Sequence, residues 1–189
     1  MKMSYLKHVV PTKLLWIDLE MTGLNPEKDV ILEVAAVVTD FNFVVLDSYE
    51  SHVAHPRELI GQLQDANPWY DEFPENKRYF MDNAENGLPD EAVERELLDF
   101  LKRNFGDEPA VLAGNSIHND RNFIKKWWPD FDSALHYRML DVSAWKVFMQ
   151  GRYDIEYKKG ETHRAVGDIQ ESIAELKYYL DVLPDLAKA

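Results

Sequence analysis

Residues 14–23 read Leu14-Leu15-Trp16-Ile17-Asp18-Leu19-Glu20-Met21-Thr22-Gly23, an apolar run that ends in two acids and a Thr-Gly pair. The apolar part predicts a buried β-strand. Because side chains two positions apart on a strand point to the same face, we expect Asp18 and Glu20 to lie side by side. Neighbouring carboxylates repel each other, and a hard divalent cation between them removes that repulsion. The pair therefore predicts a metal site, and the Thr22-Gly23 turn predicts open space beside it.

The composition is typical of a folded protein, and the length of 189 residues predicts one domain, residues 1–189. Hydrophobic residues make up 46% of the chain, which excludes disorder as its general state. The absence of cysteine excludes disulfides, thiolate catalysis and thiolate zinc sites. Residues 1–8 lack the apolar core of a signal peptide, and no apolar stretch approaches the roughly 20 residues that a membrane span needs. We therefore expect a cytoplasmic protein with no membrane partner.

The net charge of −13 restricts the kind of nucleic acid that the chain can bind. A protein that coats long nucleic acid does so by neutralising many phosphates with basic side chains, which this chain does not favour. A short oligonucleotide has few phosphates, and bound metal ions can neutralise them locally. The charge thus disfavours stable binding of long nucleic acid and leaves short oligonucleotides possible as ligands.

Hydrophobic patterns predict a mixed sheet flanked by helices, because strands come first and strand–helix alternation follows. The first three strands are expected to form an antiparallel meander, with a tight connection at residues 40–42. Strands are predicted at 14–19, 30–39, 43–53, 110–113 and 137–140, short helices within 54–88, and longer helices at 89–105, 120–128, 142–149 and from about 162 to about 180.

A second acidic motif, Asn115-Ser116-Ile117-His118-Asn119-Asp120-Arg121-Asn122-Phe123, directly follows a predicted buried strand. Asp120 lies where a helix opens, and the free backbone N–H groups there favour an anion. Taken alone, this acid is better explained by a helix cap than by a metal ligand.

The third motif is His163-Arg164-Ala165-Val166-Gly167-Asp168. Five residues of a continuous helix turn through about 500°, so His163 and Asp168 cannot share a helix face. We expect Asp168 to point inward from the helix and His163 to lie in the segment that approaches it. The alternative is a surface histidine near a capped helix.

Taken together and in this order, the three motifs resemble those of the DEDDh 3′→5′ exonucleases. The matching patterns are Asp18-x-Glu20-x-Thr22-Gly23, Asn115-x4-Asp120-x2-Phe123 and His163-x-Ala165-x2-Asp168. Four blocks resemble one branch of that family, the oligoribonucleases: residues 16–24, residues 114–117, residues 136–143 and residues 174–179. The resemblance covers nearly the whole chain.

This resemblance implies a ribonuclease H-like α/β fold, with a mixed five-stranded sheet flanked by helices. It implies a 3′→5′ exoribonuclease that hydrolyses very short oligoribonucleotides, dinucleotides above all, to 5′-mononucleotides. Two divalent cations, Mg²⁺ or Mn²⁺, would be held by Asp18, Glu20, Asp120 and Asp168, and His163 would act as the general base.

Substrate-binding residues and a homodimer are implied by the same resemblance. Leu24 would be an apolar wedge against the bases, and Ser116, Arg138 and Ser143 would form a cap that grips the 5′ phosphate. Tyr137 would reach the partner's site across the dimer interface. Without the resemblance, Arg138 is better explained as a strand-end ion pair and Ser143 as a helix N-cap. Asp141 is expected to be a buried or capping acid with no metal role.

Residues 62–88 depart from the family pattern. Members usually carry a tryptophan at a fixed distance before a His-x-x-Ser-Gly-Leu-like segment, and residues 83–88 differ from that segment here. Base stacking needs an aromatic face, so Trp69, Tyr79 and Phe80 are rival candidates. Gly167 stands where an acid often precedes the final metal aspartate, which would weaken the support of that ligand.

Three other functions are alternatives to this one. A DEDDh exonuclease of broader specificity would act on DNA or structured RNA 3′ ends, and a non-catalytic nucleotide-binding protein could share the fold. Residues 114–118 nearly match the nucleophile elbow of a serine hydrolase, but His118 occupies a position that needs a small residue. His52 and His55 are interpreted as surface residues at a strand end.

Overall fold

The structure is a computed structural model that describes residues 10–158 and 164–186. Its centre is a five-stranded mixed sheet in the order β3-β2-β1-β4-β5. The strands are β1 (Lys13–Met21), β2 (Ile31–Asp40), β3 (Val45–His52), β4 (Ala110–Gly114) and β5 (Leu135–Asp141). The pairs β1–β2 and β2–β3 are antiparallel, and β1–β4 and β4–β5 are parallel. The predicted meander and the mixed five-stranded sheet are confirmed.

Eight helices surround the sheet in the described residues. They are α1 (Arg57–Asp65), α2 (Trp69–Glu72), α3 (Pro74–Asn83), α4 (Asp90–Phe105), α5 (His118–Trp127), α6 (Pro129–Ser133), α7 (Val142–Tyr153) and α8 (Ala165–Leu186). The last helix therefore continues past the predicted end near residue 180, and α7 continues past residue 149. Within the described residues, no helix has the length and apolar character that crossing a bilayer requires.

Alternation along β1 divides the core into two layers, one on each face of the sheet. Leu15, Ile17 and Leu19 pack with side chains of α4, α5 and α6. Leu14 and Trp16 pack on the other face, with side chains of α7 and α8. Asp18 and Glu20 continue the second series, so they emerge on the face that α8 covers.

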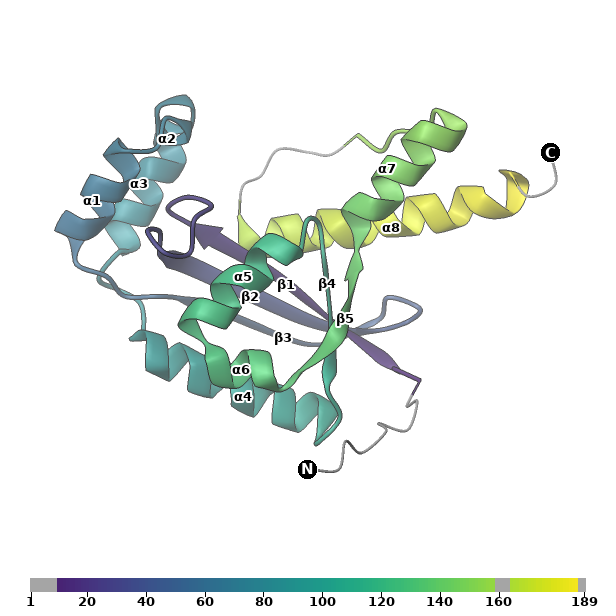
Figure 1. The fold of residues 1–189 in the computed structure, drawn as a ribbon, viewed down its shortest axis with the longest axis horizontal. Coiled ribbons are helices and arrows are strands. Elements are labelled where there is room, and N and C mark those ends of the chain that lie inside the picture. Colours follow the sequence, from purple (N-terminus) through teal and green to yellow (C-terminus); the bar gives the residue numbers. More distant parts are fainter. Residues whose placement is uncertain (1–9, 159–163, 187–189) are drawn as a thin grey trace.

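The helices α1, α2 and α3 form a third group, whose hydrophobic cluster joins Ile60, Tyr70 and Phe80 to Val30 and Leu32 around the start of β2. Figure 1 shows this group at one end of the sheet, away from α7 and the C-terminal half of α8. The group lies beside the loop that follows β1, because Tyr70 donates a hydrogen bond to the carbonyl of Met21 (3.1 Å). It therefore stands next to the end of β1 that carries the acids.

One prediction for this region was wrong. His55, expected at the surface, is buried, and its Nε2 lies 2.7 Å from the carbonyl oxygen of Ile31. A buried imidazole needs such a partner, and this one ties the segment after β3 to β2. His52 is half-buried and faces Glu33.

Candidate active site

Three acids converge at the end of β1. Ligand atoms of Asp18, Glu20 and Asp168 lie within 4.8 Å of one another, and all three side chains are partly exposed. The alternation of β1 places the first two on one face, and the first turn of α8 places Asp168 against them. The predicted convergence of these three residues is therefore found, although they are separated by up to 150 positions in the chain.

The electrostatics of this group call for a cation. Burial, the largest cause, and the nearby carboxylates of Asp168 and Glu33 together raise the pKa of Glu20 to about 8, while Arg164 acts in the opposite direction. Carboxylate oxygens that crowd together in this way are the donors that Mg²⁺ and Mn²⁺ prefer. The three residues therefore fit a hard divalent cation.

This crowding predicts how the stability of the metal-free protein depends on pH. Between its ordinary value of about 4.5 and its folded value of about 8, Glu20 keeps its proton when folded and loses it when unfolded. Unfolding then releases a proton, so the free energy of unfolding falls as pH rises through this window. We expect chemical denaturation in EDTA to show this decline. Glu20→Gln should flatten it, and a slope unchanged by the substitution would contradict the prediction.

Asp120 approaches from the opposite layer, on α5. It is buried, and its Oδ1 accepts a hydrogen bond from the backbone N–H of Leu19 (3.0 Å). Burial raises its pKa to about 7. The residue before α5, Ile117, makes no side-chain capping hydrogen bond, and the Asp120 carboxylate accepts its hydrogen bond from β1. It lies near the acids without belonging to the group within 4.8 Å.

His163 lies outside the described residues, so its predicted place stays a prediction. The described chain resumes at Arg164, whose carbonyl accepts a hydrogen bond from the N–H of Asp168 (2.9 Å).

A cavity of about 760 Å³ opens beside the acids. Glu20 and Met21 line it from β1, Leu24 and Lys28 from the following loop, and Trp69 from α2. The lining is mostly apolar, and the charged side chains of Glu20, Lys28 and Asp29 also border the space.

Asp29 stabilises the conformation of the loop that contains Leu24. Its carboxylate accepts hydrogen bonds from the Thr22 hydroxyl (3.1 Å) and from the N–H of Asn25 (2.9 Å). A Cβ at Gly23 would lie 2.6 Å from that carboxylate, so the turn needs glycine there. Leu24 is consequently held out from the loop with 75% of its surface exposed.

The three aromatic candidates have different surroundings. Trp69 lines the cavity and is partly exposed. Phe80 is only 2% exposed and belongs to the core of the α1–α3 group, so it has no face to offer a base. Tyr79 is not among the cavity-lining residues, and its hydroxyl accepts a hydrogen bond from Arg164 (2.6 Å). Trp69 is therefore the aromatic residue that a ligand in this cavity would meet.

Ser116 and Ser143 lie together at the ends of β4 and β5. Their hydroxyl oxygens are 3.0 Å apart, and the backbone N–H groups of both residues donate to Oδ1 of Asp141. Asp141 is the N-cap of α7, as expected for it, so the alternative explanation of Ser143 as the cap was wrong. Ser116 has a φ of 49°, a left-handed conformation that turns its side chain toward this cluster.

Arg138 and Tyr137 lie on the exposed part of β5. No ion pair of Arg138 exists within the described ranges, and its guanidinium lies over the ring of Tyr137, 5.2 Å from the centroid. The ion-pair explanation of Arg138 is therefore wrong for this part of the chain. Tyr137 is 65% exposed and stacks on His136.

Two residues near the acids were not predicted. Glu33 is fully buried on β2 directly opposite Glu20 in the sheet, and Arg164 contacts it. The sequence does contain a sign of this pair: Glu33 is an acid inside the otherwise apolar run of residues 30–38. A charge in such a run needs a partner, because an unpaired charge is not tolerated there.

Comparison with known proteins agrees with this geometry. A family model described as RNase_T, exonuclease, matches residues 15–176. A probable oligoribonuclease of Caenorhabditis elegans is 38% identical over 94% of this chain and 93% of its own length. The oligoribonuclease of Chromobacterium violaceum is 38% identical, over 88% and 92% respectively. The mitochondrial oligoribonuclease of Homo sapiens is 37% identical, over 88% and 71%.

Solved structures show the same fold at low identity. Escherichia coli exonuclease I in complex with a 5cy-dA13 oligonucleotide superposes with a TM-score of 0.64 and 14% identity, over 93% of this chain. A product-bound structure of exonuclease I gives a TM-score of 0.63, also at 14% identity. The chain spans 42% and 45% of those two chains.

Proposed function

The chain belongs to the RNase_T exonuclease family, among the oligoribonucleases, and is a 3′→5′ exoribonuclease; from this we propose that it hydrolyses very short oligoribonucleotides, dinucleotides above all, to 5′-mononucleotides. The observation that carries the proposal is the group of three acids, one of which, Glu20, also lines the cavity that Leu24 and Trp69 border. We treat residues 1–189 as one exonuclease domain. A cytoplasmic location is the corresponding proposal for its place in the cell.

Asp18, Glu20, Asp120 and Asp168 would hold the divalent cations, Mg²⁺ or Mn²⁺; the first, second and fourth already lie within 4.8 Å of one another, and Asp120 approaches from α5. When bound, two such ions stabilise the attacking and leaving oxygens of an in-line displacement at phosphorus. The raised pKa of Glu20 supports this role, because a cation removes the cost of ionising it.

His163 is the proposed general base. A histidine titrates near neutral pH, so a neutral ring can accept a proton from the attacking water at one nitrogen. It lies five residues before Asp168 in the sequence, within the third motif. This step rests on the sequence motif.

The cavity would hold the base of the 3′ nucleotide between Leu24 and Trp69. The side chain of Leu24 is exposed on a braced loop, and Trp69 offers an aromatic face across the space. Stacking on an aromatic ring does not depend on which base is present, which suits an enzyme that degrades mixed sequences.

Trp69→Ala should raise the KM for a diribonucleotide about tenfold, because stacking contributes ~1–3 kcal/mol per base. Trp69→Phe should retain most of the affinity, since it keeps a ring at the same position. Steady-state kinetics measures both. Phe41→Ala, which removes an exposed ring from the β2–β3 connection, is the control. An unchanged KM in Trp69→Ala would show that another residue stacks.

Ser116, Ser143 and Arg138 would bind the 5′ phosphate of the substrate. The first two hydroxyls already share one site at the ends of β4 and β5, and Arg138 is an exposed cation on the same strand as Asp141. A fixed site for the 5′ phosphate limits the length of the substrate, because a longer chain cannot present both ends at once.

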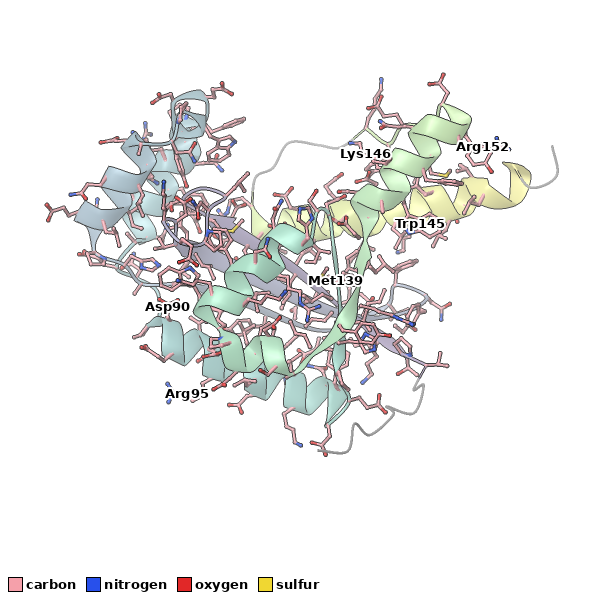
Figure 2. The ribbon with its side chains drawn as sticks, viewed as in Figure 1. Asp90, Arg95, Met139, Trp145, Lys146 and Arg152 are labelled. Atoms are coloured by element: carbon pink, nitrogen blue, oxygen red, sulfur yellow. The ribbon has the colours of Figure 1, made fainter. Side chains whose placement is uncertain are left out.

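A homodimer would use the exposed flank formed by β5 and α7. Tyr137 and Met139 on β5, and Val147 and Phe148 on α7, expose 65%, 37%, 71% and 54% of their surfaces. Figure 2 labels Met139 on the strand and Trp145 and Lys146 on the helix that continues from it. An edge strand with apolar side chains is a common site of association, and a dimer here would bring Tyr137 toward the partner. Light scattering of the purified protein tests this state.

A length series of labelled RNA, with and without a 5′ phosphate and with Mg²⁺ or Mn²⁺, tests the proposed function. We expect the 5′-phosphorylated dimer to be the best substrate. Preference for long RNA or for DNA would favour an exonuclease of broader specificity. Tight binding of the dimer without turnover would favour a non-catalytic nucleotide-binding protein.

A further inference from the structure

A polar cluster built around the buried Glu33 lies beside the acid group and joins β2, β3, α3 and the residue before α8. Its centre is Glu33, whose Oε2 lies 3.2 Å from Nη2 of Arg164, 3.4 Å from the hydroxyl of Tyr79 and 3.5 Å from Nδ1 of His52. Glu33 has no exposed surface. The four residues come from positions 33, 52, 79 and 164, so the cluster exists only in the folded chain.

Arg164 is held in this cluster by three kinds of contact. Its guanidinium lies over the ring of Tyr79, 3.8 Å from the centroid, and Nη2 donates to the Tyr79 hydroxyl (2.6 Å) and to Glu33. A planar guanidinium can stack and donate at the same time, which an ammonium group cannot do. The contacts therefore fix the orientation of the Arg164 side chain and also the position of its positive charge.

The cluster touches the acid group from two sides. The carbonyl of Arg164 accepts the hydrogen bond from the N–H of Asp168, at the start of α8. Glu33 stands directly opposite Glu20 in the β1–β2 register, and residues opposite each other in an antiparallel pair project from the same face. A shift of Arg164 would thus move the first turn of α8 relative to β1.

We propose that Arg164 is a positioning residue for the metal-binding acids: clamped between Glu33 and Tyr79, it fixes the first turn of α8 and through it the carboxylate of Asp168. The inference rests on the proposed function, since it concerns cation binding by those acids. In this role Arg164 acts through Asp168.

The test measures Mn²⁺ binding directly, by electron paramagnetic resonance of the free ion, alongside steady-state kinetics of the full chain. In Arg164→Met we expect Mn²⁺ affinity about tenfold weaker, as for other groups that support metal ligands. The kcat at fixed Mn²⁺ should fall while the KM for the diribonucleotide stays within about twofold, because the cavity is untouched.

Arg103→Met is the matched control. Arg103 also donates to a carboxylate, that of Asp47 (2.7 Å), and lies over an aromatic ring, that of Phe100 (4.7 Å), but on α4. It should lose a similar set of contacts with no change in Mn²⁺ affinity. Equal losses in both variants would mean a general effect on stability and would overturn the inference.

Two further variants separate geometry from charge. Arg164→Lys keeps the positive charge without the planar fork, so we expect Mn²⁺ affinity close to that of Arg164→Met. Full recovery with lysine would overturn the positioning role. Tyr79→Phe keeps the ring and removes the hydroxyl, and we expect its Mn²⁺ affinity to be about threefold weaker. In the double variant with Arg164→Met, the two losses of affinity should not be additive.

The outcomes also distinguish this inference from the proposed function. If the natural chain neither binds Mn²⁺ nor cleaves RNA, the proposed function fails. If it does both and Arg164→Met binds Mn²⁺ as tightly, only the positioning role fails. If Arg164→Met does not fold, as judged by circular dichroism, Tyr79→Phe becomes the deciding variant. Wild-type Mn²⁺ affinity in Tyr79→Phe would then overturn the positioning role of Arg164.

Discussion

Asp168→Asn is expected to lower the rate of dinucleotide hydrolysis by about a thousandfold or more while the chain still folds. The carboxylate of Asp168 lies within 4.8 Å of those of Asp18 and Glu20, so removing its charge removes one side of the proposed cation site. Stabilisation of the transition state by bound cations is worth several kcal/mol, and ~4 kcal/mol corresponds to about a thousandfold in rate.

The same substitution should make the metal-free protein more stable. Asp168 is the carboxylate that does most to raise the pKa of Glu20, so neutralising it relieves repulsion within the folded chain. Loss of activity together with a higher melting temperature in EDTA distinguishes a disabled site from a misfolded protein. Asp181→Asn, an exposed aspartate farther along α8, is the control and should change neither quantity. More than a tenth of the original rate in Asp168→Asn would refute a metal role for this acid.

The second large effect is expected for Arg138→Gln and depends on the substrate. A bidentate pair between arginine and phosphate supplies two charge-assisted hydrogen bonds, worth ~1.5–3 kcal/mol each, so its loss should lower kcat/KM by about a hundredfold for the 5′-phosphorylated dimer. The dimer that lacks the 5′ phosphate should be cleaved at nearly the same rate by both proteins. The substrate is therefore its own control.

Ser143→Ala extends that experiment. Its hydroxyl lies 3.0 Å from that of Ser116, so its removal should also penalise the phosphorylated dimer, to a smaller extent because a neutral donor is lost. If either variant loses activity equally on both dimers, the 5′ phosphate is bound elsewhere.

Much of the fold could be predicted because local patterns and the core agree. Residues 14–20 alternate between the two faces of the sheet, and that alternation alone places Asp18 and Glu20 together. The helix of residues 90–105 was equally clear, with Pro89 before it, acids in its first turn and Gly106 after it. These signals lie within a few residues of the features that they predict.

The parts that could not be predicted depend on contacts across the chain. The sequence leaves Asp120 as a candidate helix cap or metal ligand. It does not show the hydrogen bond that Asp120 accepts from the N–H of Leu19, because the two residues are 101 positions apart. Residues 54–88 form three helices of only 9, 4 and 10 residues, and the aromatic residues in them did not reveal which one is buried, as Phe80 is, and which lines the cavity, as Trp69 does. His55 looked like a surface residue because its partner, the carbonyl of Ile31, belongs to another strand.

The group of α1, α2 and α3 owes its packing to a small cluster separate from the two that sandwich the sheet. One wall of the cavity is thus built on helices that hold none of the proposed metal ligands, so variation there that keeps the hydrogen bonds to Met21 and Arg164 would leave the acids on β1 and α8 in place. Swapping or lengthening these helices is accordingly a practical route for redesigning which oligonucleotides the protein accepts. Any such replacement must keep Tyr79 in place, because its hydroxyl forms the hydrogen bonds that connect these helices to Glu33 and Arg164.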